Sequence, residues 1–213
     1  MKKILIIVIL FMSMSQMNFA SEPEPKDQNR DSQKLEKATF AGGCFWCMQP
    51  PFDNLKGVVS TTVGYTGGHT KNPTYEEVGE GATGHAEAIE VVFDPAQITY
   101  AQLLEVFWQN IDPTALNRQF HDAGTQYRTA IFYHGEEQKR LAEESKEQLE
   151  RSGRFQQPIA TEIVAAGPFY SAEEYHQKYY KVCPIRYDMY HAASGRDQYK
   201  EKHWSGRQGA AEK

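Results

Sequence analysis

The sequence contains little cysteine and no excess of positive charge. Only three of its 213 residues are cysteines, so at least one thiol lies outside any intramolecular disulfide, which argues against a disulfide-stabilised scaffold. The count fits a redox centre as well as it fits one buried thiol and one simple bridge. The formal net charge is −5 and no local basic patch is apparent, so we expect no nucleic-acid partner.

Long apolar runs are scarce as well. Two lysines precede the apolar run Ile4 to Met12, and small or polar residues follow as far as Ala20. The run is too short to cross a bilayer comfortably, so it indicates a secretory signal peptide at residues 1–20. Asn18 stands where a small residue is preferred before cleavage, which leaves an uncleaved anchor as the alternative. We expect an exported protein of the periplasm or cell envelope, with no stable membrane insertion after signal removal.

One globular domain follows the N-terminal segment. Residues 21–37 are rich in Glu, Lys, Gln and Pro and have almost no large apolar side chain, which is typical of a polar linker. We place a single catalytic domain at residues 38–204 and a frayed tail at residues 205–213.

Short β-type runs alternate with helical ones inside the domain. Capping-box spacings at Thr99 with Gln102 and at Ser171 with Glu174 predict the starts of two helices. A third helix, Glu136 to Arg151, is mostly charged and is expected on the surface. The five predicted strands are Lys37–Ala41, Val58–Tyr65, Ala86–Phe93, Tyr127–Tyr133 and Ala160–Ala166.

A Cys-Phe-Trp-Cys motif follows the first predicted strand and a glycine pair. Cys44 should stand at a helix N-terminus, where unpaired backbone N–H groups stabilise a thiolate and lower the pKa of the thiol. Cys44 is therefore the better nucleophile of the two. Cys47, three residues later, would be within disulfide reach on the same helix.

Other interpretations of this motif remain open. The two thiols could form a structural disulfide or simply pack in the core. Half of a zinc site is less favoured, because no second cysteine pair stands at ligand spacing. A thioredoxin-like redox site is also conceivable, although in that family the tryptophan precedes the first cysteine, whereas Phe45 and Trp46 lie between the cysteines here.

Glu87 lies within a predicted strand. Alternation places it on the apolar side with Ile89 and Val91, whereas Glu90 faces the other way. Burial would raise its pKa and keep the carboxyl partly protonated, as a general acid requires. The alternative is a strand-end carboxylate that reaches water or pairs with Arg128.

Two tyrosines stand at borders between loops and regular elements. Tyr75 and Tyr127 could both direct their hydroxyls at a ligand oxygen. Each could equally be a packed ring with its hydroxyl in solvent, since the chain has twelve tyrosines.

Five ordered motifs together resemble those of the A-type methionine sulfoxide reductases. The resemblance runs from about Phe40 to the Tyr175-His176-Gln177 segment, and Cys183-Pro184 and Ser194-Gly195-Arg196 look like the C-terminal region of one branch. The motifs are Gly43-Cys44-Phe45-Trp46-Cys47, Gly64-Tyr65-Thr66-Gly67-Gly68, Asn72-Pro73-Thr74-Tyr75, Gly84-His85-Ala86-Glu87 and Asp122-Ala123-Gly124-Thr125-Gln126-Tyr127-Arg128.

The resemblance implies a fold and a reaction. The fold would be α/β: a two-layer plait with a ferredoxin-like core, a mixed sheet and a long irregular C-terminal region. Cys44 would attack the sulfur of methionine S-sulfoxide, free or in proteins, and become a sulfenic acid. Glu87 would act as the acid, and no metal or other cofactor is implied. Further implied roles are oxygen binding for Tyr75 and Tyr127, orientation of the site for Asp122, and an apolar wall for the S-methyl group from Phe45 and Trp46.

The resemblance leaves the recycling route open. Many relatives have glycine where this chain has Cys47, and they use cysteines near the C-terminus instead. We expect Cys47 to resolve the sulfenic acid first, because it is close, and Cys183 to act as a second shuttle. A thioredoxin-like reductant is the implied partner. The leading alternative function is a thiol-disulfide oxidoreductase.

Overall fold

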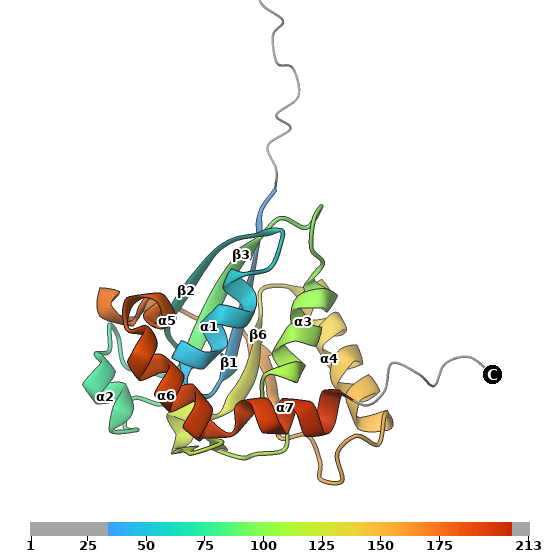
Figure 1. The fold of residues 1–213 in the computed structure, drawn as a ribbon. Helices are drawn as coiled ribbons and strands as arrows, with labels where there is room; N and C mark the ends of the chain where they lie inside the picture. The colour runs from blue at the N-terminus through green and yellow to red at the C-terminus, as the bar shows by residue number, and fades with distance from the viewer. Residues whose placement is uncertain (1–33, 206–213) are drawn as a thin grey trace, which may run out of the picture. The chain divides into compact units, whose positions relative to one another are not determined.

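A six-stranded mixed sheet forms the centre of the protein (Figure 1). The structure is a computed structural model that describes residues 34–205; the predicted signal peptide and most of the predicted linker and tail lie outside the described residues. Neighbouring strands are antiparallel except for the pair β6 and β7. In sheet order the strands are β7 (Glu162–Ala165), β6 (Thr129–Tyr133), β1 (Glu36–Gly42), β3 (Ala86–Phe93), β2 (Val58–Thr66) and β8 (Tyr170–Ser171).

The five predicted strands are all present, and β3 has the predicted bounds. The first strand begins at Glu36, inside the predicted linker. The long segment 110–126 contains a short hairpin that was not predicted, formed by β4 (Arg118–Gln119) and β5 (Asp122–Ala123), and the 3₁₀ turn η1 (Thr125–Tyr127) follows it. Two-residue strands carry too few side chains to show an alternating pattern.

Three helices cover one face of the sheet: α1 (Phe45–Asp53), α3 (Tyr100–Gln109) and α4 (Glu136–Arg151) (Figure 1). The core lies between these helices and the sheet. Phe40 of β1 stacks between Phe52 of α1 and Phe107 of α3, with ring centroids 5.4 and 5.0 Å away. Truncating such a ring typically costs ~3–5 kcal/mol of stability.

The opposite face of the sheet buries mainly small side chains. Alanines of β1, β3 and β6 form a cluster there with Phe132, and Phe169 packs against it. No described helix contributes to this cluster, so the fold has two layers, as predicted.

The capping signals had mixed outcomes. The Thr99–Gln102 box is confirmed and begins α3, and a second box at Thr74 begins the short helix α2 (Tyr75–Gly79). The predicted helix start at Ser171 is wrong. Ser171 ends strand β8, and only the 3₁₀ turn η2 (Glu174–His176) follows.

The C-terminal region, expected to be irregular, is largely helical. It contains α5 (Tyr179–Val182), α6 (Pro184–Ser194) and α7 (Arg196–Trp204), and α6 and α7 are joined at Gly195, whose φ is +76°. Within residues 34–205, no helix is both long and apolar enough to span a membrane.

Candidate active site

Cys44 lies at the junction of β1 and α1. The turn needs glycine: Gly43 has a φ of +78°, and a Cβ there would lie 2.4 Å from Cβ of Gln119. Cys44 is the N-cap residue of α1, and its carbonyl oxygen accepts hydrogen bonds from the N–H groups of Cys47 and Met48 at 3.1 and 3.3 Å. The predicted helix-terminal position is therefore confirmed.

The low pKa predicted for Cys44 from its helix-terminal position is wrong. The side chain is only 6 % exposed, and burial raises the pKa of the thiol well above its ordinary value. The hydrogen bond with Cys47 raises it further, while the Tyr190 hydroxyl and the Arg196 charge lower it. Burial thus outweighs the helix terminus, and Cys44 rests as a thiol.

Glu87 occupies the apolar face of β3 beside this turn. It is 3 % exposed, and its Oε2 accepts a hydrogen bond of 3.0 Å from the backbone N–H of Phe45. Burial, followed by the charge of Cys44, raises the pKa of the carboxyl well above its usual range. Arg128 contacts Glu162 instead, at 3.6 Å. Glu87 is therefore a buried carboxylic acid next to the thiol, as its alternation predicted.

Tyr75 and Tyr127 reach the same site from α2 and from η1. Burial, followed by the charges of Glu87 and Cys44, raises the pKa of Tyr75 to about 12. Burial and the same two charges also raise the pKa of Tyr127. Both hydroxyls therefore stay protonated and able to donate hydrogen bonds near Glu87 and Cys44.

Phe45 and Trp46 lie in one aromatic cluster but differ in accessibility. Phe45 is 1 % exposed and packs near Tyr75 and His176, with centroids 6.4 and 5.2 Å away, so it offers little surface to a ligand. Trp46 is partly exposed and stacks on Tyr179 of α5 at 3.9 Å, and its Nε1 donates to Nδ1 of His176 at 3.0 Å. Trp46 is the more accessible wall of the site.

Asp122 approaches from β5. Its Oδ2 accepts a hydrogen bond from the hydroxyl of Tyr190 in α6, and the same hydroxyl also interacts with the Cys44 thiol. Asp122 therefore holds the hydroxyl of a tyrosine that also contacts the Cys44 thiol. Tyr190 was missed in the sequence, where it is one tyrosine among several in a helix with no local signal.

The two other cysteines have different surroundings. Cys47 is buried on α1, its side chain is hydrogen-bonded to that of Cys44, and this bond lowers the pKa of Cys47. Cys183 is partly exposed at the junction of α5 and α6. Its carbonyl oxygen accepts a hydrogen bond from the N–H of Tyr187, one turn along α6. Burial, followed by the charge of Cys47, raises the pKa of Tyr187. All three thiols are free, and Cys47 is the one in contact with Cys44.

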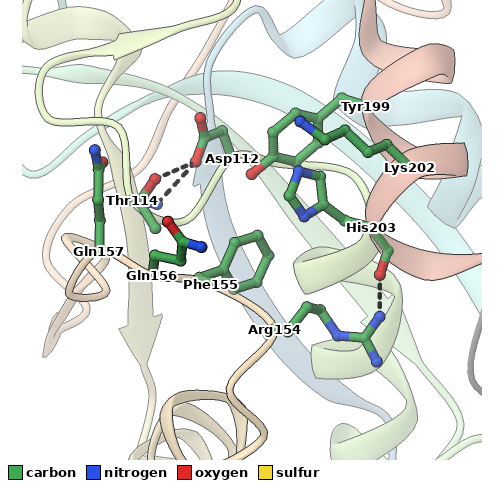
Figure 2. Close-up of a pocket in the computed structure, with 9 residues that line it drawn as sticks. All are labelled: Asp112, Thr114, Arg154, Phe155, Gln156, Gln157, Tyr199, Lys202 and His203. Atoms are coloured by element: carbon green, nitrogen blue, oxygen red, sulfur yellow. Dashed lines mark hydrogen bonds between the residues drawn. The ribbon is translucent and has the colours of Figure 1, made fainter.

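A separate pocket of about 360 Å³ lies between α7 and the segment that follows α4 (Figure 2). None of the predicted site residues lines it. In it, Asp112 accepts hydrogen bonds from the N–H and hydroxyl of Thr114, and Arg154 donates to the carbonyl of His203. This pocket is therefore distinct from the Cys44 site. In the part of the chain that the structure describes, no group of three or more His, Cys, Asp or Glu side chains could hold a metal ion.

The comparisons agree with this geometry. The family model described as "Peptide methionine sulfoxide reductase" matches residues 36–208. The chain belongs to the peptide methionine sulfoxide reductase family. The buried acid, the two tyrosines and the helix-terminal cysteine thus belong to a methionine sulfoxide reductase.

Sequence relatives of this reductase cover most of its length. The peptide methionine sulfoxide reductase MsrA of Bacillus licheniformis is 57 % identical over 173 residues, which are 81 % of this chain and 96 % of the relative. The Bacillus pumilus MsrA is 58 % identical over 174 residues, 82 % of this chain and 98 % of the relative.

Solved structures support the same fold. Methionine sulfoxide reductase A of Corynebacterium diphtheriae has a TM-score of 0.64 and 39 % identity, covering 71 % of this chain and 76 % of its own. Reduced Mxr1 of Saccharomyces cerevisiae has a TM-score of 0.67 and 33 % identity, and the match covers 75 % of this chain and 91 % of the Mxr1 chain. These matches confirm the two-layer α/β fold.

Proposed function

We propose that this reductase uses Cys44 as nucleophile and Glu87 as acid to reduce methionine sulfoxide. One observation carries the assignment of roles. The buried Glu87 carboxyl, whose pKa is raised, accepts a hydrogen bond from the N–H of Phe45, the residue next to Cys44. A protonated carboxyl at that place can give a proton to the sulfoxide oxygen as its charge develops. Tyr75 and Tyr127 donate hydrogen bonds to the same oxygen.

In the first step, the Cys44 sulfur attacks the sulfur of the sulfoxide. The sulfur–oxygen bond of the substrate breaks, and the oxygen ends on Cys44 as a sulfenic acid while methionine leaves. One thiol and one sulfoxide give one sulfenic acid and one thioether, so atoms and protons balance. The methionine sulfoxide is reduced by two electrons and Cys44 is oxidised by two.

The second step restores Cys44. The Cys47 thiol attacks the sulfenic acid, water leaves, and a Cys44–Cys47 disulfide forms. Cys47 is favoured over Cys183 because it already touches Cys44. A thioredoxin-like dithiol then reduces the disulfide and is itself oxidised. The complex of yeast Mxr1 with Trx2, a relative 26 % identical to this chain with a TM-score of 0.50, supports such a donor.

Separate assays distinguish this function from a thiol-disulfide oxidoreductase. The purified enzyme should reduce a methyl sulfoxide with dithiothreitol as donor and should not accelerate the reduction of insulin disulfides. The opposite pattern would contradict the proposal. Separated epimers of peptide-bound and free methionine sulfoxide should show turnover of the S epimer only.

We also propose that the protein is exported. The support is the sequence of residues 1–20, which lies outside the described residues. Fractionation of the producing cells and N-terminal sequencing of the mature protein test this proposal. A cytoplasmic protein with an intact N-terminus would contradict it.

A further inference from the structure

A buried arginine without a carboxylate partner lies behind the Cys44 turn. Arg196, the first residue of α7, is 6 % exposed. None of the ion pairs found within residues 34–205 includes it, and its Nε has no hydrogen-bond partner. A guanidinium stays charged at any pH a protein tolerates, and burying an uncompensated charge is costly. Such a cation calls for an anion that the resting contacts do not supply.

The contacts of Arg196 place its charge beside the turn that precedes Cys44. Nη1 donates to the carbonyl of Asn110 at 3.0 Å and Nη2 to that of Gly42 at 3.4 Å. The guanidinium also lies over the Phe120 ring, 4.5 Å from its centroid. A Cβ on Gly43 would lie 3.0 Å from Nη2, so the cation lies close to the residue immediately before Cys44. Every direct partner is neutral or a π face.

The charge of Arg196 acts on three titratable groups, which are the two cysteines and Glu87. Its charge lowers the pKa of Cys44, of Cys47 and of Glu87. Glu87 must keep its proton to act as the acid, so a sulfur is the anion that suits the site. The two thiols are hydrogen-bonded to each other, which allows one proton to serve both.

Arg196 is the one cation among the described titratable groups that face the cysteines. The other groups are carboxyls and tyrosines. A carboxylate repels an anionic sulfur, and a protonated carboxyl or tyrosine can only donate a hydrogen bond to it. They are Glu87 of β3, Asp122 of β5, Tyr75 of α2, Tyr127 of η1, and Tyr187 and Tyr190 of α6.

We propose that Arg196 is the buried counter-cation that lets Cys44 and Cys47 share one proton as a thiol–thiolate pair. The inference rests on the proposed role of Cys44 as nucleophile and names what activates it. When the shared proton moves from Cys44 to Cys47, Cys44 becomes the attacking thiolate and Cys47 the thiol that later resolves the sulfenic acid. No proton leaves the pair and no external base is needed. Arg196 acts through its charge and is a positioning residue.

The test counts thiolates without using a sulfoxide. In a Cys183→Ser background only the pair remains, and the ultraviolet absorbance of thiolates can be followed against pH. We expect the midpoint pH of one thiol to lie below the range of free cysteine and that of the other to lie far above it. Two coincident midpoints near the ordinary value would overturn the proposal, whatever happens to any Arg196 variant.

Substitutions of Arg196 sharpen the same measurement. Arg196→Gln keeps a donor for the carbonyls but loses the charge, and should raise the first midpoint by about one pH unit, a tenfold loss of thiolate. Arg196→Lys keeps the charge and should stay near the parent. An unchanged midpoint in Arg196→Gln, or an equal shift in Arg196→Lys, would contradict the role of the charge.

A control separates charge from helix packing. Tyr199→Phe removes the bond of α7 to Asp112 and leaves Arg196 in place, so its midpoints should match the parent. A shift in Tyr199→Phe as large as in Arg196→Gln would assign the effect to packing of α7. If Cys44→Ser kept sulfoxide turnover while the midpoints behaved as expected, the proposed function would fail and the counter-cation would stand.

Discussion

The active site has two sides that come from different parts of the fold. The sheet side consists of Cys44, Phe45 and Glu87, held by β1, α1 and β3 in the centre of the molecule. The helix side consists of Tyr190 and Arg196, held by α6 and α7. In the proposed function, the sheet side supplies the nucleophile and the proton, whereas the helix side supplies hydrogen bonds and charge. Bond-making chemistry and its electrostatic control can therefore be altered separately.

The largest effect should come from the nucleophile itself. Cys44→Ser should abolish sulfoxide reduction, because a hydroxyl is a far weaker nucleophile and cannot become a sulfenic acid. The measurement is single turnover with dithiothreitol supplied. Turnover in this variant would mean that another cysteine attacks, and the division between the two sides would lose its basis.

Glu87→Gln tests the proton supplied by the sheet side. The amide keeps the shape but lacks the acid, so single-turnover reduction should slow by ~10²–10⁴-fold. Glu90→Gln is the matched control, because Glu90 lies on the other face of the same strand and pairs with Lys37 at 3.0 Å. The control should react at the normal rate. Near-normal rates for Glu87→Gln would show that a tyrosine or water supplies the proton.

Cys47→Ser tests whether recycling also belongs to the sheet side. The first turnover should still occur but more slowly, because the proposed proton-sharing partner of Cys44 is lost. Steady-state turnover with a thioredoxin-like donor should fall further, by at least about tenfold, since a contacting thiol has a large proximity advantage. Steady-state turnover of the Cys183→Ser variant should fall less. Mass spectrometry after one equivalent of sulfoxide should find a Cys44–Cys47 bridge in the parent. A Cys44–Cys183 bridge forming at full rate in Cys47→Ser would show that Cys183, at the start of α6, is the resolving cysteine.

Tyr190→Phe probes the helix side directly. The hydroxyl contacts both Asp122 and the Cys44 thiol, so its loss should lower the single-turnover rate by about tenfold, as for one hydrogen bond to a charged group. Tyr133→Phe, on β6, should have no effect. Equal rates in the two variants would show that α6 only covers the site.

Asp53 attaches the C-terminal region to α1, and its effect should be the smallest. Burial alone would raise its pKa, but hydrogen bonds from Tyr180, Lys178 and Lys181 outweigh burial and lower the pKa to about 2. A carboxyl with a depressed pKa stabilises the fold above its unfolded pKa of about 4, and this stability is lost as the pH falls from about 4 to about 2. Asp53→Asn should therefore cost about 1–2 kcal/mol at neutral pH and flatten the acid limb of the stability curve.

Urea unfolding at several pH values measures this effect. Glu137→Gln, which breaks an exposed pair with Arg140, should change stability very little. If Asp53→Asn and Glu137→Gln behaved alike, the contact of α5 with α1 would contribute nothing measurable.

The sheet side could be predicted from the sequence because its signals are local. Alternation along β3 placed Glu87 on the buried face, and the glycines before Cys44 placed the thiol at a helix terminus. Burial at that terminus was not predictable in the same way. Burial sets the direction of its pKa shift, and contacts such as those with Tyr190 and Arg196 come from segments far along the chain, which no local pattern encodes.

The helix side could not be predicted for the same reason. Arg196 belongs to a Ser-Gly-Arg motif that indicates family membership but gives no contact, and Tyr190 has no local signature. The wrong helix start at Ser171 has a related cause. Ser171 pairs with Gly64 in the sheet, and this long-range pairing overrides a capping spacing that would otherwise favour a helix.

The contact between Arg196 and Gly42 joins positions 154 residues apart in the chain. The Cys44 turn is therefore synthesised long before Arg196, the proposed counter-cation. A chain that ends before α6 contains Cys44 and Cys47 but neither Tyr190 nor Arg196. In the proposed thiol–thiolate pair, Cys44 therefore gains its counter-cation only after residue 196 has been made and has folded against Gly42, so its activation depends on nearly the whole domain.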